Sequence, residues 1–227
     1  MMLFDFICFI KTNMYKKNIT IAKTARYYVI GEPGDHITTV WFVCHGYGQL
    51  ANYFIRNFEV LEKETTLIIA PEGLHRFYWE KFSGRVVASW MTKEDREDDI
   101  NDYVRYLDDV YEEVMKSLNN KTVKIIGLGF SQGTSTICRW IANKKSIVHG
   151  LILWAGSLPE DMPFSHDPFG HFKIYYAVGD EDKFMKEEQR NKTEQVLMNH
   201  QLNYEIIRFN GKHELNEAVL LDLMKKI

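Results

Sequence analysis

Residues 122–135 read T-V-K-I-I-G-L-G-F-S-Q-G-T-S, and this stretch decides how the rest of the chain is interpreted. Its first half is rich in β-branched and apolar residues, which is typical of a buried strand. Its second half contains G-F-S-Q-G at 129–133, which fits the pattern G-x-S-x-G. In that pattern a strand turns abruptly into a helix, and the tight turn leaves no room for a Cβ atom at either glycine. The stretch therefore predicts that the hydroxyl of Ser131 is held out at a strand-to-helix turn.

The composition is that of a soluble globular protein. The chain has 227 residues, of which 45% are hydrophobic and 26% charged, and this suits one domain with a sizeable core. The formal net charge of −3 provides neither a basic footprint for nucleic acid nor a polybasic membrane signal. No apolar run is long enough to span a bilayer, so we expect no stable membrane insertion.

The N-terminus and the cysteines bear on location. Residues 1–10 are apolar, but no basic segment precedes them, no small-residue cleavage site follows and Asp5 interrupts them. We therefore favour an extension outside the fold at 1–13 over a secretory signal, with a single domain at 14–227. Met14 is then the expected translation start, and mass spectrometry of the native N-terminus would test it.

The three cysteines, Cys8, Cys44 and Cys138, have no paired spacing, which favours a reducing, cytoplasmic location.

Strand-like and helix-like segments alternate along the chain. Such alternation predicts a mostly parallel, twisted sheet with helices on both faces, and in such sheets active sites gather at the carboxyl ends of the strands. We expect strands at 19–22, 25–30, 38–44, 66–70, 123–128, 147–154, 172–178 and 203–209, the first two forming an antiparallel edge. We expect helices at 51–63, 92–118, 134–143, 183–198 and 214–226, with Thr92 capping the second, and loops at 74–91 and 155–170.

A serine hydroxyl is a weak nucleophile, so catalysis by Ser131 needs a base and an orienting carboxylate. On α/β-hydrolase folds these follow the serine in the order acid, then histidine. Of eight histidines, only His200 and His213 lie beyond the acidic cluster at 179–182. His200 falls at a predicted helix end, whereas His213 falls in the turn after the last strand, so His213 is the expected base.

Three adjacent acids compete for the orienting role. Asp182 stands third after Gly179, which leaves room for a turn before the carboxylate folds back, so we favour Asp182 and keep Asp180 as the alternative. The competing interpretation is that all three, Glu181 included, are solvated loop acids, one of which caps the next helix.

Acyl transfer also needs hydrogen-bond donors for an oxyanion. One is expected to be the main-chain N–H of Gln132, the residue after the serine. The other is expected from H-G-Y-G at 45–48, where the main-chain N–H of Tyr47 is the candidate donor. His45 precedes the serine in the chain, and we therefore interpret it as a structural residue.

Taken together, H-G-Y-G, G-F-S-Q-G, G-S-L-P at 156–159, G-D-E-D at 179–182 and G-K-H at 211–213 resemble the phospholipase/carboxylesterase family of α/β-hydrolases, which includes the acyl-protein thioesterases. The resemblance implies Ser131, Asp182 and His213 as a catalytic triad, with main-chain donors at Tyr47 and Gln132. It implies hydrolysis of esters or thioesters of short to medium acyl chains through an acyl-enzyme, without metal or cofactor. The chain departs from the family at Gln49, where Asp is common, and at Val178, where His is common.

The substrate side is less defined. No insertion between 143 and 182 is large enough for a cap domain, so the loops 74–91 and 155–170 are the expected cover. Their side chains that we expect to line a substrate site are Trp79, Arg85, Trp90, Met91 and Leu158. Arg85 would bind an anionic part of a substrate or pair with an acid among 94–99. Another acyl or peptidase hydrolase, and a catalytically silent binding protein on the same fold, stay as alternatives. The chain length of the substrate and the oligomeric state stay open.

Overall fold

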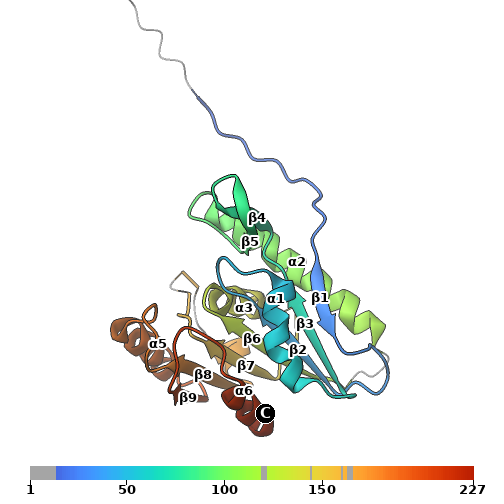
Figure 1. Cartoon of the computed structure of the whole chain (residues 1–227), viewed down its shortest axis with the longest axis vertical. Coiled ribbons are helices and arrows are strands. Elements are labelled where there is room, and N and C mark those ends of the chain that lie inside the picture. Colours follow the sequence, from blue (N-terminus) through green and yellow to red (C-terminus); the bar gives the residue numbers. More distant parts are fainter. Residues whose placement is uncertain (1–13, 119–121, 144, 160, 163–165) are drawn as a thin grey trace, which may run out of the picture.

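The computed structural model describes residues 14–118, 122–143, 145–159, 161–162 and 166–227. Its central sheet has seven strands, in the order β1 (Tyr27–Ile30), β3 (Thr66–Pro71), β2 (Thr39–Cys44), β6 (Lys124–Phe130), β7 (Gly150–Trp154), β8 (Lys173–Gly179) and β9 (Tyr204–Phe209) (Figure 1). The edge strand β1 pairs antiparallel with β3, and every other pair in this sheet is parallel. The predicted mostly parallel sheet is thereby confirmed.

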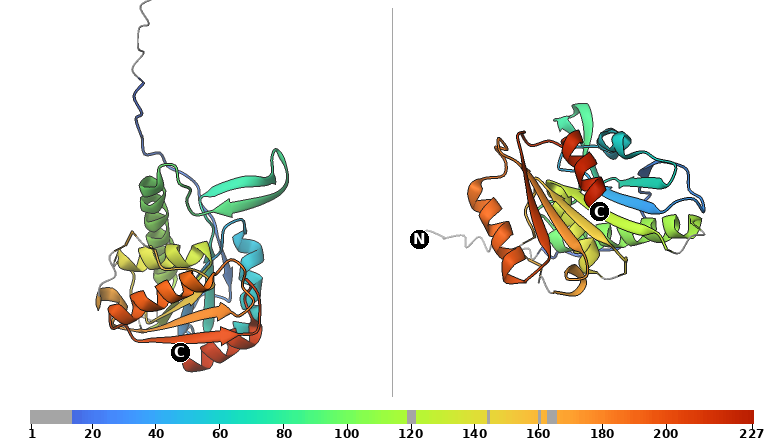
Figure 2. Two further views of the ribbon diagram at one scale, coloured as in Figure 1. Left: turned by 90° about the vertical axis from the view of Figure 1, so that its left-hand side faces the viewer. Right: turned by 90° about the horizontal axis from the view of Figure 1, so that it is seen from below.

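Helices cover both faces of the sheet. They are α1 (Ala51–Phe54), the 3-10 helix η1 (Ile55–Leu61), α2 (Arg96–Ser117), α3 (Gln132–Ala142), α4 (His166–Phe169), α5 (Glu187–Asn199) and α6 (Glu217–Lys226). Helix α6 packs with η1 on one face, and α2 packs with α3 on the other (Figure 2). In the described part of the chain, no segment forms a separate cap domain, as expected.

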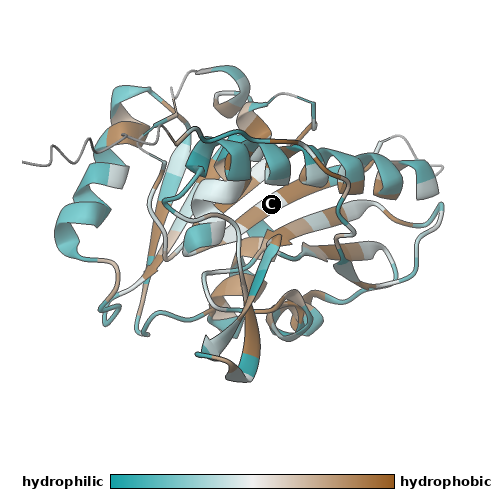
Figure 3. Ribbon diagram, turned by 90° about the horizontal axis from the view of Figure 1, so that it is seen from above, coloured by the Kyte–Doolittle hydropathy of each residue, from teal (hydrophilic) through white to brown (hydrophobic). Residues whose placement is uncertain are grey.

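The central strands are apolar along almost their whole length because both faces of the sheet are covered. Strands β3 and β7 are buried at every position, and β2 and β6 at every position but the first. Figure 3 shows these strands as hydrophobic and the outward surface of α2 as hydrophilic. Cys44 and Cys138 are buried free thiols within this core.

Residues 74–91 do not form the predicted loop. They fold into an antiparallel hairpin of β4 (His75–Glu80) and β5 (Ser83–Ser89), which projects from the body (Figure 2). Its outer part is exposed on both sides, including Phe82 at 94% exposure. A strand that buries neither face lacks the alternation of apolar and polar residues by which strands are recognised, and this explains the wrong prediction.

Two further boundaries differ from the predictions. Residues 19–22 form no strand, since β1 begins only at Tyr27, where β3 offers it a partner. Helix α2 begins at Arg96, not after Thr92. The Thr92 hydroxyl accepts a hydrogen bond from the Glu94 amide at 3.2 Å, so it closes a local turn before the helix instead of capping it. The predicted extension at 1–13, with Cys8, lies outside the described residues.

Candidate active site

Ser131 sits at a strained turn between β6 and α3. Its φ of 53° and ψ of −116° lie in a region that residues with a side chain rarely adopt. The turn is tight on both sides. A Cβ atom at Gly129 would lie 2.3 Å from the Gly133 carbonyl oxygen, and one at Gly133 would lie 2.1 Å from the Cys44 carbonyl oxygen. Both positions therefore require glycine, as the G-x-S-x-G pattern predicts.

The structure brings Asp182 and His213 together at the carboxyl edge of the sheet. Oδ2 of Asp182 lies 2.8 Å from Nδ1 of His213. The carboxylate is fully buried, and its Oδ1 accepts hydrogen bonds from the main-chain amides of Phe184 (2.8 Å) and Met185 (3.1 Å). Two main-chain donors on one oxygen fix the orientation of the carboxylate. The alternative acid, Asp180, is exposed.

Arg190 braces the loop that carries Asp182. From α5, its guanidinium donates to the carbonyl oxygens of Gly179 and Asp182, each at 3.1 Å, and to that of Met185 at 2.8 Å. A Cβ atom at Gly179 would lie 2.3 Å from the carbonyl oxygen of Gly211 in the loop before His213. The acid loop and the histidine loop thus touch through main chain. The sequence analysis missed Arg190, which has no motif and lies eight residues beyond the acid.

Two aromatic rings enclose His213. The ring centroids of Phe130 and Phe184 lie 5.0 Å and 4.9 Å from that of the imidazole, whose side chain keeps 20% exposure. Phe130 directly precedes Ser131, so the imidazole lies beside the turn that carries the serine. The structure shows no hydrogen bond between Oγ of Ser131 and His213, both of which are described residues; such bonds often close only in the substrate complex.

His45 is a structural residue, as interpreted from the sequence. Its Nε2 accepts from the Gly73 amide at 2.9 Å, so its Nδ1 carries the proton and donates to the Gly46 carbonyl oxygen at 2.8 Å. The ring is fully buried, and burial lowers the pKa of His45 to about 4. The neutral ring therefore ties the loop after β2 to the loop after β3.

In the loop after β2, at residues 45–48, the main-chain amide of Tyr47 has no acceptor among the described residues. The Gly46 amide donates to Oε1 of Gln49 at 2.8 Å, and the Gly48 amide donates to the Ala88 carbonyl oxygen at 2.9 Å. Within the described residues, no acceptor is found for the main-chain amides of Tyr47 and Gln132. These are the two donors that the sequence predicts for an oxyanion. Gln49, where the chain departs from the family pattern, fills a role inside the loop itself.

The hairpin base connects the two predicted donors. Ala88 bonds the loop after β2 through both its main-chain groups. Oε1 of Gln132 accepts from the Trp90 amide at 3.2 Å, and its Nε2 donates to the Met91 carbonyl oxygen at 3.1 Å. Residues 88–91 therefore position both segments.

The predicted substrate-lining residues divide into three groups. Trp90 is fully buried and donates from Nε1 to the His45 carbonyl oxygen at 2.8 Å. It therefore holds the loop after β2 in place, and its predicted contact with substrate is wrong. Arg85 lies over the Trp79 ring at 5.3 Å on the exposed hairpin and forms no ion pair with a described acid among 94–99. Met91 and Leu158 line a cavity of about 960 Å³.

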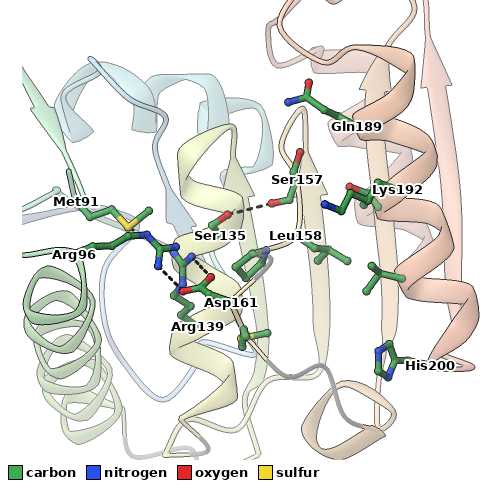
Figure 4. Close-up of a pocket in the computed structure, with 14 residues that line it drawn as sticks. Met91, Arg96, Ser135, Arg139, Ser157, Leu158, Asp161, Gln189, Lys192 and His200 are labelled. Atoms are coloured by element: carbon green, nitrogen blue, oxygen red, sulfur yellow. Dashed lines mark hydrogen bonds and ion pairs between the residues drawn. The ribbon is translucent and has the colours of Figure 1, made fainter. Parts of the chain in front are cut away.

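This cavity lies between α3, α5 and the loop after β7 (Figure 4). Polar and charged side chains share its wall with apolar ones. It is lined by Met91, Arg96, Ser135, Arg139, Ser157, Leu158, Pro159, Asp161, Met162, Gln189, Lys192, Thr193, Val196 and His200.

Comparison with known proteins places the chain in a family. The sequence profile described as Phospholipase/Carboxylesterase matches residues 25–227. The chain belongs to this family. No curated protein sequence matches the chain significantly. Among the described residues, no group of metal-ligating side chains is found and no helix is long and apolar enough to cross a membrane.

Solved structures share the fold of this family member. The chain is 15% identical to acyl-protein thioesterase 2 of Zea mays, with a TM-score of 0.69 over 89% of this chain and 97% of that one. It is 13% identical to the Bacillus cereus carboxylesterase, with a TM-score of 0.66 over 89% and 92% of the two chains. A phospholipase/carboxylesterase of Dyadobacter fermentans is 16% identical, with a TM-score of 0.65 over 92% and 100%. At these identities the likeness establishes the α/β-hydrolase fold.

Proposed function

We propose that the protein is a serine hydrolase that cleaves carboxylic esters or thioesters of short to medium acyl chains. One observation carries this proposal: a buried Asp182 carboxylate 2.8 Å from His213 stands at the same sheet edge as a serine held in a strained turn. Backbone strain of ~1–3 kcal/mol at one residue persists only where the surrounding structure enforces it, and such residues cluster at active sites. Membership of the esterase family supports the same reaction class.

In the proposed mechanism Oγ of Ser131 attacks the acyl carbon while Nε2 of His213 takes its proton. Nδ1 of His213 donates to Asp182, which stabilises the imidazolium that forms. The amides of Tyr47 and Gln132 receive the oxyanion, and preorganised donors of this kind are worth ~3–4 kcal/mol each in comparable sites. His213 then protonates the leaving group, and water repeats the sequence to release the acid.

The test combines a label with a substrate panel. A fluorophosphonate probe should label the wild-type protein at Ser131 and leave Ser131→Ala unlabelled. A panel of p-nitrophenyl esters of rising chain length, with acyl thioesters and aminoacyl amides beside them, should show ester or thioester turnover. Preferential cleavage of amides would replace the proposal by a peptidase, and folded protein without label or turnover would favour a silent binding protein.

We also propose a cellular location, on the evidence of the two described cysteines. Cys44 and Cys138 are both buried free thiols, and burial raises the pKa of each well above its usual value. Such thiols are inert, and we propose a cytoplasmic location because free cysteines are common in reducing compartments.

A further inference from the structure

The side chain of Gln132 is held by the chain at the end of β5 and directly after it. Its Oε1 accepts from the Trp90 amide at 3.2 Å, and its Nε2 donates to the Met91 carbonyl oxygen at 3.1 Å. Nε2 also donates to Oγ of Ser89 at 3.2 Å, and this hydroxyl in turn donates to the Met91 carbonyl oxygen at 2.9 Å. Because an amide N–H only donates and a carbonyl only accepts, these contacts fit a carboxamide in one orientation.

The G-x-S-x-G pattern does not explain why residue 132 is glutamine. The donor expected from this position is a main-chain N–H, which every residue except proline carries. The contacts with residues 89–91 do require a carboxamide, since they need a donor and an acceptor at the end of one side chain. Ser89 is 1% exposed and Trp90 is fully buried, so polar groups there are unfavourable without partners. The side chain of Gln132 therefore has a role separate from its main chain.

The same segment fixes the loop after β2, which carries the Tyr47 amide. Ala88 forms two main-chain hydrogen bonds with residues 48 and 49, at 2.9 Å and 3.0 Å. Nε1 of Trp90 donates to the His45 carbonyl oxygen at 2.8 Å. The two expected oxyanion donors thus belong to segments that are both bound to residues 88–91.

An oxyanion site works only if its donors point at one position, ~2.7–3.1 Å from each. The amide of Gln132 opens α3 directly after the strained backbone of Ser131, so a rotation there would turn its N–H away. We propose that the side chain of Gln132 is a positioning residue for the oxyanion site, supported by Ser89, which holds the N–H of Gln132 in register with that of Tyr47. This inference rests on the proposed function and deepens it.

Two substitutions of Gln132 test the positioning role, since both keep the main-chain N–H and a side chain of similar length. Gln132→Met loses all three hydrogen bonds, and Gln132→Glu brings a carboxylate against the Met91 carbonyl oxygen. On the best ester of the panel, kcat should fall ~10–100-fold with KM changed less than ~3-fold; removing a whole donor costs ~10²–10³. Affinity for a trifluoromethyl ketone, which adds to Ser131 as an oxyanion, should weaken by the same factor as kcat/KM.

A double-mutant cycle measures the part of Ser89. Ser89→Ala should lower kcat ~3–10-fold alone and less than ~2-fold in the Gln132→Met background, because it acts through the carboxamide. It leaves the contacts of Gln132 with residues 90–91 in place, so it also tests the inference if a Gln132 variant fails to fold. Gln195→Glu is the matched control, since Gln195 is exposed on α5. It should leave kcat, KM and ketone affinity unchanged.

The outcomes separate this inference from the proposed function. Gln132 variants that lower the urea midpoint but keep wild-type kcat and ketone affinity would overturn the inference and leave the hydrolase standing. A raised KM with unchanged kcat would also overturn it, because that indicates lost substrate binding and no effect on the transition state.

Hydrogen exchange decides if the wild type neither hydrolyses esters nor binds the ketone, in which case the proposed function itself fails. The amides of Gly48 and Ala88 are hydrogen-bonded between the hairpin and the loop after β2, so their exchange reports how firmly that loop is held. Faster exchange of both in Gln132→Met, with the rates of Gln195→Glu as in the wild type, would support the positioning role. Unchanged exchange in Gln132→Met would reject it.

Discussion

Nδ1 of His213 lies 2.8 Å from Oδ2 of Asp182, and the other oxygen of that carboxylate accepts from two main-chain amides. All of this geometry comes from the loops after β8 and β9, adjacent parallel strands whose carboxyl ends meet at one edge. The arrangement fixes which ring nitrogen carries the proton and leaves Nε2 available for a substrate-side role.

Replacing the buried carboxylate should impair catalysis more than binding. In Asp182→Asn the His213 ring loses its carboxylate partner, so we expect kcat to fall by ~10³–10⁴ with KM changed little. Asp180→Asn is the control, since Asp180 is exposed and its amide already bonds the Phe209 carbonyl oxygen. Steady-state kinetics on the best ester of the panel measure both. A full-activity Asp182→Asn beside an inactive Asp180→Asn would reassign the acid.

Two substitutions of Ser131 should both abolish activity but differ in stability. Ser131→Ala and Ser131→Gly should both lose turnover by several orders of magnitude. Glycine tolerates the observed φ of 53° and ψ of −116° better than alanine does. We therefore expect Ser131→Gly to have a free energy of unfolding about 1 kcal/mol above that of Ser131→Ala. Urea denaturation measures this difference, and a less stable glycine variant would contradict the claim of strain at this turn.

Arg190 should act as a positioning residue. Arg190→Lys cannot reproduce its three bonds to the carbonyl oxygens of the acid loop, because an ammonium lacks the planar fork of a guanidinium. We expect stability to fall by about 1–2 kcal/mol and kcat to fall ~10-fold, with a shift of the pH–rate profile as Asp182 moves relative to His213. Arg105→Lys on the exposed face of α2 serves as control. An unchanged pH profile in Arg190→Lys would reduce its role to stability alone.

His45 should make the fold sensitive to mild acid. Burial lowers the pKa of His45 from its usual 6.5 to about 4, so at intermediate pH the unfolded state binds a proton that the folded state does not. The stability that the neutral ring contributes is complete above pH 6.5 and is lost as the pH falls towards 4, by up to about 3 kcal/mol. Urea midpoints across this range test the loss. An NMR titration that shows His45 protonating near 6.5 would refute it.

Several features were predictable because they depend on local chemistry. Gly129 and Gly133 are needed by the close main-chain contacts of the turn at Ser131, and the contact of Asp182 with His213 agrees with the room that a turn needs after β8. The buried parallel strands were recognisable as continuous apolar runs. Helix and strand limits shifted by a few residues, as expected where capping decides them.

The errors share a physical cause. Trp90 carries the same indole as Trp79, yet one is fully buried and the other is 46% exposed on the hairpin. Which ring is buried depends on what packs above it, here His45 and Tyr103 against Trp90. Likewise the cations of the cavity come from α2, α3 and α5, and no spacing along the chain connects them.

The sequence by itself determined the parallel sheet, the serine turn and the order of the expected triad, because periodicity and the steric demands of glycine act between near neighbours. Only the tertiary structure decided that Arg190 braces Asp182, that residues 88–91 connect the loops of Tyr47 and Gln132, and that Arg96 meets Arg139 across Asp161. These contacts join segments far apart in the chain, and their energies depend on burial and distance, which exist only once the sheet has assembled. The turn at Ser131 depends on both local sequence and tertiary structure: the glycines make the turn possible, and the packed strands hold it in its strained conformation.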